Sequence, residues 1–278
     1  MIVLLLSFAI GSARAADPAT LVLPTDAAGL AAQLTSIELG IRDPSVPAAT
    51  AAAYGHAQQR IYRQLVLDPA LSTDVQSRLP PALQPPVGRG LVATAGLMSL
   101  VKSPRADLPN WRIEAPGDLE MLTAEYHAAE TATGTPWSVL AAVHLAETRF
   151  GRIHGTSVSG ALGPMQFMPA TWAAYGTGDV RDPHDAIRGA GNYLAKSGAP
   201  GDLDKAIWAY NHHTGYVAGV KGFAEVIADE PVTLRGFYGW EVEYRTPKGW
   251  LWLPVGYAEE TRVPIAPFCA RWGSPYCP

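Results

Sequence analysis

The sequence predicts a mainly α-helical fold that is followed by a C-terminal β-hairpin. Apolar residues recur at steps of three and four in the first third of the chain, the spacing of amphipathic helices. In the middle of the chain, Thr135 and Asp182 each stand directly before a proline, a typical helix start. After Pro231 the pattern changes to an alternation rich in aromatic and β-branched residues, which is typical of strands.

The composition excludes some classes of function. The chain has 278 residues, of which 48% are apolar, so it can bury a sizeable core in one domain or two. Its formal net charge is -4 with no long run of either sign, which argues against a nucleic-acid partner, because neutralising phosphates needs clustered Lys and Arg. The segment from Leu145 to Trp172, which contains the candidate residue Glu147, has no metal or nucleotide motif. We therefore expect no cofactor and no metal.

The first 15 residues have the pattern of a cleaved export signal. A short apolar stretch, too short to span a bilayer, is followed by Ala13-Arg14-Ala15, the small-x-small pattern of a signal-peptidase site. No Lys or Arg precedes the apolar stretch, so a true start further upstream and retention of the segment as an anchor are the alternatives. We expect an exported protein of the extracytoplasmic cell envelope, or a secreted one.

Residues 16–110 are predicted to form an N-terminal helical region. Two or more helices are expected between Thr25 and Leu71, where the apolar stripe of the first comprises Leu30, Leu34, Ile37 and Ile41. The stretch from Leu79 to Gly90 is too rich in proline for one continuous helix. A second proline-marked stretch ends near Asp118, and we place a domain boundary near Asn110.

Residues 111–230 are predicted to form a second, mostly helical domain. Proline fits the first position of a helix, so Thr135 and Asp182 are expected to cap the helices that follow them. The expected helices cover residues 118–133, 135–148, 182–196, 202–210 and 216–227.

Residues 231–278 are predicted to contain the hairpin and a clipped tail. The segments FYGWEVEYR and GWLWLPVGY are the expected strands, with TPK and Gly249 between them as turn. Cys269 and Cys277 lie close together, and an even pair of cysteines in an exported protein usually forms a disulfide. A redox pair or half of a metal site is the alternative, but the C-x-x-C spacing and a nearby histidine are missing.

Glu147 is the main candidate for chemistry. It shares a helical stripe with Leu140, Val143 and His144, which should face the core. Loss of solvation and the negative end of the helix dipole both raise the pKa of a carboxyl group at such a position. A glutamate that stays protonated near neutral pH suits a general acid for glycoside cleavage. The alternative is a structural salt bridge to a neighbouring cation such as Arg149 or Arg152.

A second carboxylate, which glycosidases usually need, is not obvious. The nearest acidic cluster comprises Asp179, Asp182 and Asp185. Asp182 is explained as a helix cap, and Asp185 as an acidic residue in the first helical turn. A calcium loop is the alternative function for this cluster, but a full series of ligands is missing.

Two further motifs follow Glu147 along the chain. A glycine-containing loop leads to Met165, Gln166 and Phe167, and the amide of Gln166 suits the hydroxyl and acetamido groups of a sugar. Met165 and Phe167 by themselves fit a core position better. Tyr210 and Asn211 end a helix. The Tyr210 hydroxyl could contact the protonated carboxyl group of Glu147. The alternative is a tyrosine packed in the core, followed by an asparagine that ends the helix.

These three elements, in this order, resemble the lytic transglycosylase (SLT-like) domain of the lysozyme-like superfamily, which cleaves bacterial peptidoglycan. Glu147-Thr148 resembles the family's glutamate followed by Ser or Thr at a helix end. The segment from Gly160 to Gln166 resembles its G-A-x-G-[LP]-M-Q loop, and Ala209-Tyr210-Asn211 its A-Y-N motif. ETRFGR, GPMQFMPATW and the tail look like the secreted transglycosylases of actinobacteria. The family usually has Ser at position 148 and Leu at position 164.

The resemblance implies a lysozyme-like α+β catalytic domain and a peptidoglycan lytic transglycosylase. In such enzymes one glutamate, here Glu147, protonates the glycosidic oxygen between MurNAc and GlcNAc. It then deprotonates the muramic C6 hydroxyl, which leaves a 1,6-anhydro end. Tyr210 would orient Glu147. The substrate groove would involve Thr148, Met165, Gln166, Phe167, Tyr210, Asn211 and Tyr216. The expected partner is the peptidoglycan glycan strand, and we expect a monomer.

Three other functions stay open at this point. A hydrolytic muramidase would use water on the same scaffold. A non-catalytic cell-wall glycan-binding protein would only bind glycan, with Glu147 buried. Finally, the tail could bind carbohydrate through exposed tryptophans, although packing of the hairpin on the helices is favoured because large aromatics are mostly buried. The tryptophans concerned are Trp240, Trp250 and Trp252.

Overall fold

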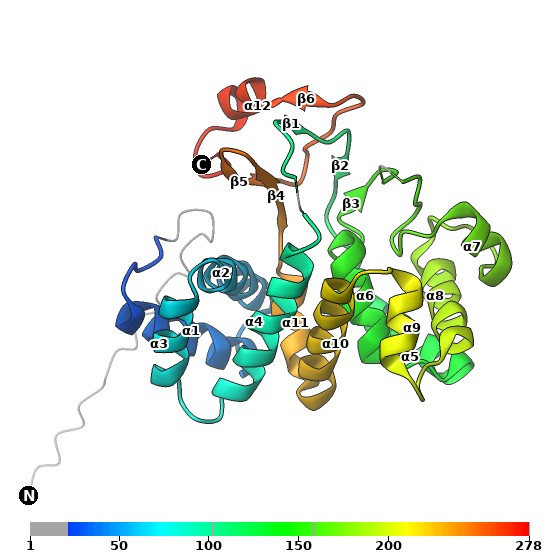
Figure 1. Cartoon of the computed structure of the whole chain (residues 1–278), viewed down its shortest axis with the longest axis horizontal. Helices are drawn as coiled ribbons and strands as arrows, with labels where there is room; N and C mark the ends of the chain where they lie inside the picture. Colours follow the sequence, from blue (N-terminus) through cyan, green and yellow to red (C-terminus); the bar gives the residue numbers. More distant parts are fainter. Residues whose placement is uncertain (1–21, 102, 158, 278) are drawn as a thin grey trace, which may run out of the picture.

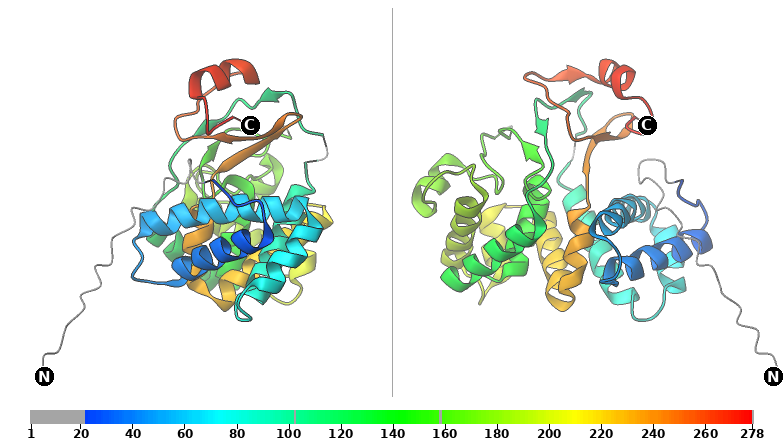
Figure 2. Two further views of the ribbon diagram at one scale, coloured as in Figure 1. Left: turned by 90° about the vertical axis from the view of Figure 1, so that its left-hand side faces the viewer. Right: turned by 180° about the vertical axis from the view of Figure 1, so that it is seen from behind.

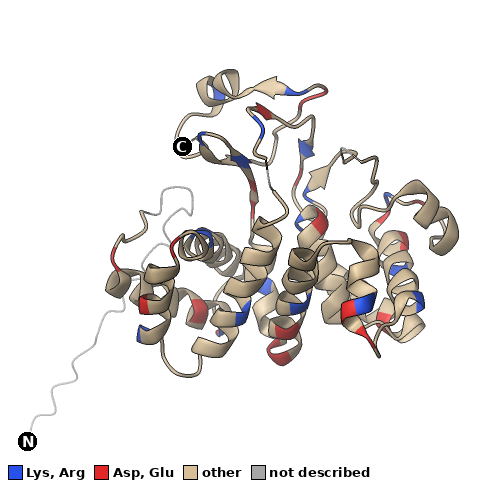
Figure 3. Ribbon diagram, in the orientation of Figure 1, with Lys and Arg blue, Asp and Glu red and all other residues tan. Residues whose placement is uncertain are grey.

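The computed structural model describes residues 22–101, 103–157 and 159–277. The expected export signal over residues 1–15 lies outside these ranges. The described chain is mainly helical, with a few short strands, as expected (Figure 1). Within these ranges, no helix has both the length and the apolar character needed to cross a membrane. Acidic and basic residues are interspersed along the helices (Figure 3).

The N-terminal region is helical, as the apolar spacing predicted. Its helices are α1 (Ala27–Arg42), α2 (Ala48–Leu67), α3 (Pro69–Arg78) and α4 (Gln84–Met98). The proline-rich stretch is not one continuous helix, yet α4 begins inside it. Pro85 and Pro86 occupy the first turn of α4, where a missing N–H leaves no helical hydrogen bond unmade.

The middle of the chain contains the five expected helices and one that was not expected. They are α5 (Leu119–Thr133), α6 (Trp137–Thr148), α7 (Pro169–Tyr175), α8 (Pro183–Ser197), α9 (Leu203–Tyr210) and α10 (Thr214–Asp229), and α7 is the unexpected one. Asp182 caps α8 by accepting a hydrogen bond from the Asp185 N–H at 3.2 Å, as predicted. The predicted cap at Thr135 is wrong. Its hydroxyl donates to the Gly191 carbonyl at 2.9 Å, and Pro136 is the N-cap residue of α6, which therefore has no side-chain cap.

Among the described residues, the strands form three antiparallel pairs, one of which is the predicted hairpin. Its first strand is shorter than expected, because Phe237 and Tyr238 belong to a helix, α11 (Leu234–Tyr238), and not to the strand. β4 (Val242–Thr246) pairs with β5 (Gly249–Leu253), and Gly249 takes a positive φ of 126° at the turn. β1 (Asp107–Leu108) pairs with β6 (Val263–Pro264), and β2 (Arg112–Ile113) pairs with β3 (Ile153–His154). Figure 2 shows the C-terminal strands and α12 (Ile265–Trp272) gathered on one side of the helical body.

Two hydrophobic cores hold these parts together. The larger extends from Leu30 in α1 to Trp240, just after α11 (Leu234–Tyr238), and includes side chains from α2, α4, α6 and α10. The N-terminal helices therefore share one core with the middle of the chain. The smaller core joins β1, β2, the hairpin and α12, with Leu108, Leu253 and Phe268 among its members.

The tail packs against the hairpin. The expected disulfide between Cys269 and Cys277 is present. Next to it, the backbone N–H of Trp252 donates to the Tyr276 carbonyl at 3.1 Å, and the centres of the two side-chain rings lie 4.7 Å apart. Trp240 is buried in the larger core, so it is a packing residue. Trp250 is half-buried, with the guanidinium of Arg63 5.3 Å from its ring centre.

Close backbone contacts require glycine at two helix crossings. A Cβ atom at Gly55 in α2 would lie 1.8 Å from the Gly236 carbonyl oxygen of α11. A Cβ atom at Gly96 in α4 would lie 2.4 Å from the Gly215 carbonyl oxygen of α10. Both contacts are to backbone, which cannot move aside as a side-chain end can. The N-terminal helices are thus seated tightly on α10 and α11.

Replacing Gly55 with alanine should therefore destabilise the fold. We expect Gly55→Ala to lower the free energy of unfolding by about 1 to 3 kcal/mol through overpacking. Urea unfolding followed by circular dichroism measures it. The control is Gly88→Ala in α4, whose added methyl would only contact the end of the Gln76 side chain at 3.4 Å. Equal loss of stability in the two variants would contradict the close approach of α2 and α11.

Candidate active site

The end of α6 fixes the position of Glu147. Most of α6 is buried, and the helix stops directly after Thr148. Arg149 and Phe150 have positive φ angles of 55° and 59°, and Gly151 has 83°. Three consecutive residues in the left-handed region cannot continue a right-handed helix. Glu147 therefore lies in the last turn, beside the unpaired carbonyls of the helix end.

The carboxyl group of Glu147 is partly buried and accepts one strong hydrogen bond. The Tyr216 hydroxyl, from the first turn of α10, donates to Oε1 at 2.5 Å. Burial raises the pKa of Glu147 to about 7, and the Tyr216 bond opposes this rise in part. At neutral pH the carboxyl group is therefore divided between its protonated and ionised forms.

The salt-bridge interpretation of Glu147 is wrong for the described part of the chain. Arg149 donates to the Leu145 carbonyl at 2.5 Å, and Arg152 pairs with Glu241 at 3.5 Å. No ion pair of Glu147 is present among the residues that the structure describes. Without a cation to hold it ionised, the carboxyl group keeps its raised pKa.

Tyr210 does not make the contact that the sequence analysis expected of it. Its hydroxyl donates to the Met165 carbonyl at 2.7 Å, while Tyr216 contacts Glu147. The two tyrosine rings are parallel within 5°, with centres 6.3 Å apart. Tyr210 thus holds the glycine-containing loop, and Tyr216 holds the carboxyl group. The sequence signal for this contact is the tyrosine near the start of the helix that follows A-Y-N. The resemblance implied a place for Tyr216 in the substrate groove, not a contact with Glu147.

The loop after α6 is tied to the helix by hydrogen bonds. The Thr148 hydroxyl donates to the Pro164 carbonyl at 2.6 Å and accepts from the Gly151 N–H at 3.0 Å. Gly163 has a positive φ of 73°, and a Cβ atom there would lie 1.8 Å from the Val180 carbonyl oxygen. Only glycine fits this position. The Gln166 amide donates to the Gly163 carbonyl at 2.9 Å, which closes the turn.

The other motif residues divide into buried and accessible ones. The side chains of Thr148, Met165 and Phe167 are buried, so here they support the loop and do not line an open surface. Gln166 and Asn211 are half-buried, and neither belongs to the residues that line the cavity of Glu147.

Glu147 lines a cavity of about 620 Å³. The end of α4, the residues before β2, the end of α6 and the β4–β5 hairpin form its walls. Glu243 on β4 lines the same cavity and forms an ion pair with Arg63. Glu243 was not predicted as a site residue, because nothing in the local sequence pattern brings β4 to the end of α6.

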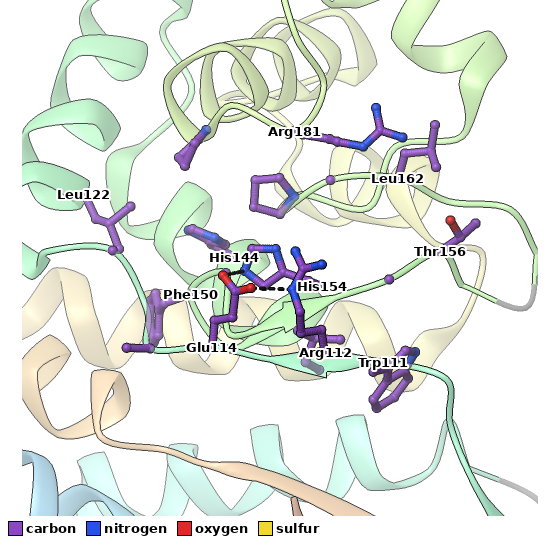
Figure 4. A pocket seen from close by; sticks show the side chains of 18 of the residues that line it. Trp111, Arg112, Glu114, Leu122, His144, Phe150, His154, Thr156, Leu162 and Arg181 are labelled. Atoms are coloured by element: carbon purple, nitrogen blue, oxygen red, sulfur yellow. Dashed lines mark hydrogen bonds and ion pairs between the residues drawn. The ribbon is translucent and has the colours of Figure 1, made fainter. Parts of the chain in front are cut away.

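A second cavity, of about 510 Å³, lies on β2, β3 and the loop (Figure 4). Glu114 and Glu259 both line it, and Glu114 pairs with Arg112 and with His154 at 3.3 Å. His144 also lines it, fully buried, with its Nδ1 2.7 Å from the Tyr126 hydroxyl. Burial lowers the pKa of His144 to about 3, so its ring is neutral. Glu147 does not line this cavity.

The acidic cluster after α7 forms caps and turns. Asp182 caps α8, and the Asp185 carboxylate accepts from the Asp179 N–H at 2.8 Å. Within the described ranges, no group of three or more His, Cys, Asp or Glu side chains is arranged to hold a metal ion.

Comparison with known families identifies the middle of the chain. Residues 125–224 match the family model described as the transglycosylase SLT domain. The chain therefore carries an SLT domain, consistent with a lytic transglycosylase of the lysozyme-like superfamily. Among curated proteins and solved structures the chain has no significant match. The matched residues include Glu147, the loop and Tyr216, whereas α1 to α4 and the hairpin lie outside them.

Removing the Tyr216 hydroxyl should raise the pKa of Glu147 further. In Tyr216→Phe the carboxylate loses the donor that stabilises its ionised form, so the titration moves to higher pH. NMR of protein labelled at the glutamate carboxyl carbon measures it. Tyr210→Phe is the matched control, because that hydroxyl donates to a backbone carbonyl. An unchanged titration in Tyr216→Phe would contradict the hydrogen bond.

Burial of Glu147 should also make stability depend on pH. The folded pKa lies above the unfolded value, so folding is favoured by this group below pH 4.5 and the benefit is lost as pH rises through 7. Glu147→Gln resembles the protonated form. We expect it to match wild type at low pH and to exceed its free energy of unfolding by about 2 to 3 kcal/mol above pH 7.

Urea unfolding at several pH values between 4 and 8.5 tests this dependence. The same substitution at Glu225, an exposed residue of α10, is the control. A difference between wild type and Glu147→Gln that stays constant over this range would show that Glu147 is not buried as described.

Proposed function

We propose that the chain is a peptidoglycan lytic transglycosylase that cleaves the MurNAc–GlcNAc β-1,4 bond and forms a 1,6-anhydro-muramic end. One observation carries the proposal. A partly buried glutamate with a pKa near 7 lines a cavity at the end of α6, inside an SLT domain. A general acid should have its pKa close to the working pH.

Glu147 acts first as the acid. Tyr216 donates to Oε1, so the proton of the neutral carboxyl group resides on Oε2. Oε2 gives this proton to the glycosidic oxygen as the bond to C1 of muramic acid breaks. The Tyr216 hydroxyl then stabilises the carboxylate that remains, because it donates to the ionised form.

Glu147 acts next as the base. Its carboxylate removes the proton of the muramic C6 hydroxyl, and the C6 oxygen bonds to C1 of the same ring. The attacking group is already part of the substrate, which avoids the entropy cost of positioning a separate water molecule. One carboxylate is sufficient for this sequence of steps.

The motif residues take different parts in the proposed site. Gln166 and Asn211 are the candidates for hydrogen bonds to sugar hydroxyl and acetamido groups, because both are half-buried amides. Thr148, Met165, Phe167 and Tyr210 hold the loop in place, since their side chains or hydroxyls are engaged within the protein. Tyr216 orients Glu147.

Location and organisation are part of the proposal. The signal-like pattern over residues 1–15 and the disulfide support export to the cell envelope, where peptidoglycan lies. We propose a monomer in which residues 111–230 form the catalytic domain. Residues 16–110 support it from one side, and residues 231–278 form part of the cavity wall.

The products of peptidoglycan digestion test the function. Mass spectrometry of the soluble products should show anhydro-muropeptides from wild type, and Glu147→Gln should lower their yield by roughly a thousandfold through loss of the acid and base. Glu225→Gln is the control with the same chemical change on the surface. Undiminished product from Glu147→Gln would sink the catalytic assignment. Glycan binding without product from wild type would indicate a binding protein.

The hydrolytic muramidase is the second candidate, and Glu243 is the observation that favours it. A second carboxylate lines the cavity of Glu147, as glycosidases that use water require. Reducing ends in the wild-type products, lost in Glu243→Gln, would establish hydrolysis. Anhydro products that persist in Glu243→Gln would support the transglycosylase assignment over the muramidase.

A further inference from the structure

The cavity around Glu147 is built largely outside the SLT domain. Trp111 precedes β2, and Tyr244, Arg245 and Trp250 belong to the hairpin that projects from the helical body (Figure 1). Only a short part of the wall, at the end of α6 and in β3, falls within residues 125–224. Most of the residues that a ligand in this cavity can contact therefore belong to this added wall.

The charges of the wall do not balance. Two of its charged residues have partners: Glu243 pairs with Arg63, and Arg105 pairs with Asp107 at 2.9 Å. Arg149 and Arg245 also line the cavity, and neither forms an ion pair with a carboxylate within the described ranges. An excess of positive charge therefore faces the space next to Glu147.

Both arginines are held by carbonyl oxygens. Arg149 donates through Nη1 to the Leu145 carbonyl at 2.5 Å, and Arg245 donates through Nη1 to the Val101 carbonyl at 3.2 Å. These bonds fix each guanidinium without an ion pair, although the carboxylate of Glu243 also stabilises the charge of Arg149 from a distance. Burial lowers the pKa of Arg149 to about 10, so it remains cationic at neutral pH. A desolvated guanidinium is well suited to bind a carboxylate through two parallel hydrogen bonds.

The proposed substrate carries a carboxylate close to the bond that is cleaved. Muramic acid bears a lactyl group at C3, which ends in a carboxylate or continues into a peptide with free carboxylates. C3 and the reacting C1 belong to the same ring. A carboxylate on this arm therefore lies within reach of the cavity that contains Glu147.

We propose that Arg149 and Arg245 form a subsite for the carboxylate of the muramic lactyl arm or its peptide. The end of α6 and the hairpin together thereby select the acidic sugar over neutral GlcNAc. Tyr244 and Trp111 support this wall, with their rings edge to face and 5.9 Å apart. This inference rests on the proposed function, because it concerns the substrate of the same site.

Ligand binding to the full chain carrying Glu147→Gln tests the subsite without catalysis. The ligands are a neutral GlcNAc tetramer, a GlcNAc–MurNAc tetrasaccharide without peptide, and the same tetrasaccharide with its peptides. Calorimetry should show roughly tenfold tighter binding of at least one acidic ligand than of the neutral tetramer, as one charge-assisted contact provides. The two acidic ligands distinguish the lactyl carboxylate from those of the peptide.

Arg245→Gln in the same background should remove this preference and leave the affinity for the neutral tetramer unchanged. Arg149→Lys, which keeps the charge but loses the planar fork, should reduce the preference in part. Arg78→Gln, at an exposed residue of α3, is the control and should keep it. Circular dichroism confirms that each variant is folded.

Equal binding of acidic and neutral ligands, or a preference that survives Arg245→Gln in folded protein, would overturn the subsite. Failure of the proposed function would look different. In that case the wild-type protein would release no cleavage product from peptidoglycan, regardless of the binding results for the three ligands.

Discussion

The rest of the site depends on the hydrogen bond between Tyr216 and Glu147. The carboxyl group lies at the negative end of α6 and away from bulk water, and both conditions oppose its ionisation. The neutral Tyr216 hydroxyl stabilises the ionised carboxylate of Glu147 only in part, so the pKa of Glu147 stays raised. An arginine in that place would hold the carboxyl group ionised. The left-handed turn after Thr148 and the Thr148 bond to the loop then keep the surrounding backbone in one arrangement.

This hydrogen bond joins two helices, so it depends on how firmly α10 is seated. α10 packs on α4 through glycines, with the backbones of Gly96 and Gly215 too close for any side chain. The N-terminal helices and the middle of the chain share one core. The region before the SLT domain is therefore part of the support of Glu147.

Local sequence signals predicted most of the helices and the hairpin, because spacing, caps and alternation act over a few residues, whereas α7 and α12 were not predicted. Thr135 failed as a cap because a distant carbonyl, that of Gly191, took its hydroxyl. Glu147 was identified with the direction of its pKa shift. The contact of Tyr216 with Glu147 and the position of Glu243 were not predicted, since each depends on how whole elements pack. The wall of the cavity is likewise set by tertiary pairing of segments far apart in the chain.

The pairing of β1 with β6 also bears on how the cavity wall is supported. β1 leads into Trp111, and β6 follows the hairpin almost at the C-terminal end of the described residues. The smaller core needs both, together with α12. The larger core, which holds α6, contains no described residue after Trp240, whereas the smaller core that supports the hairpin is completed only by residues 263–277. The position of Glu147 and the cavity wall beside it are therefore stabilised by two different cores, which are completed at different points along the chain.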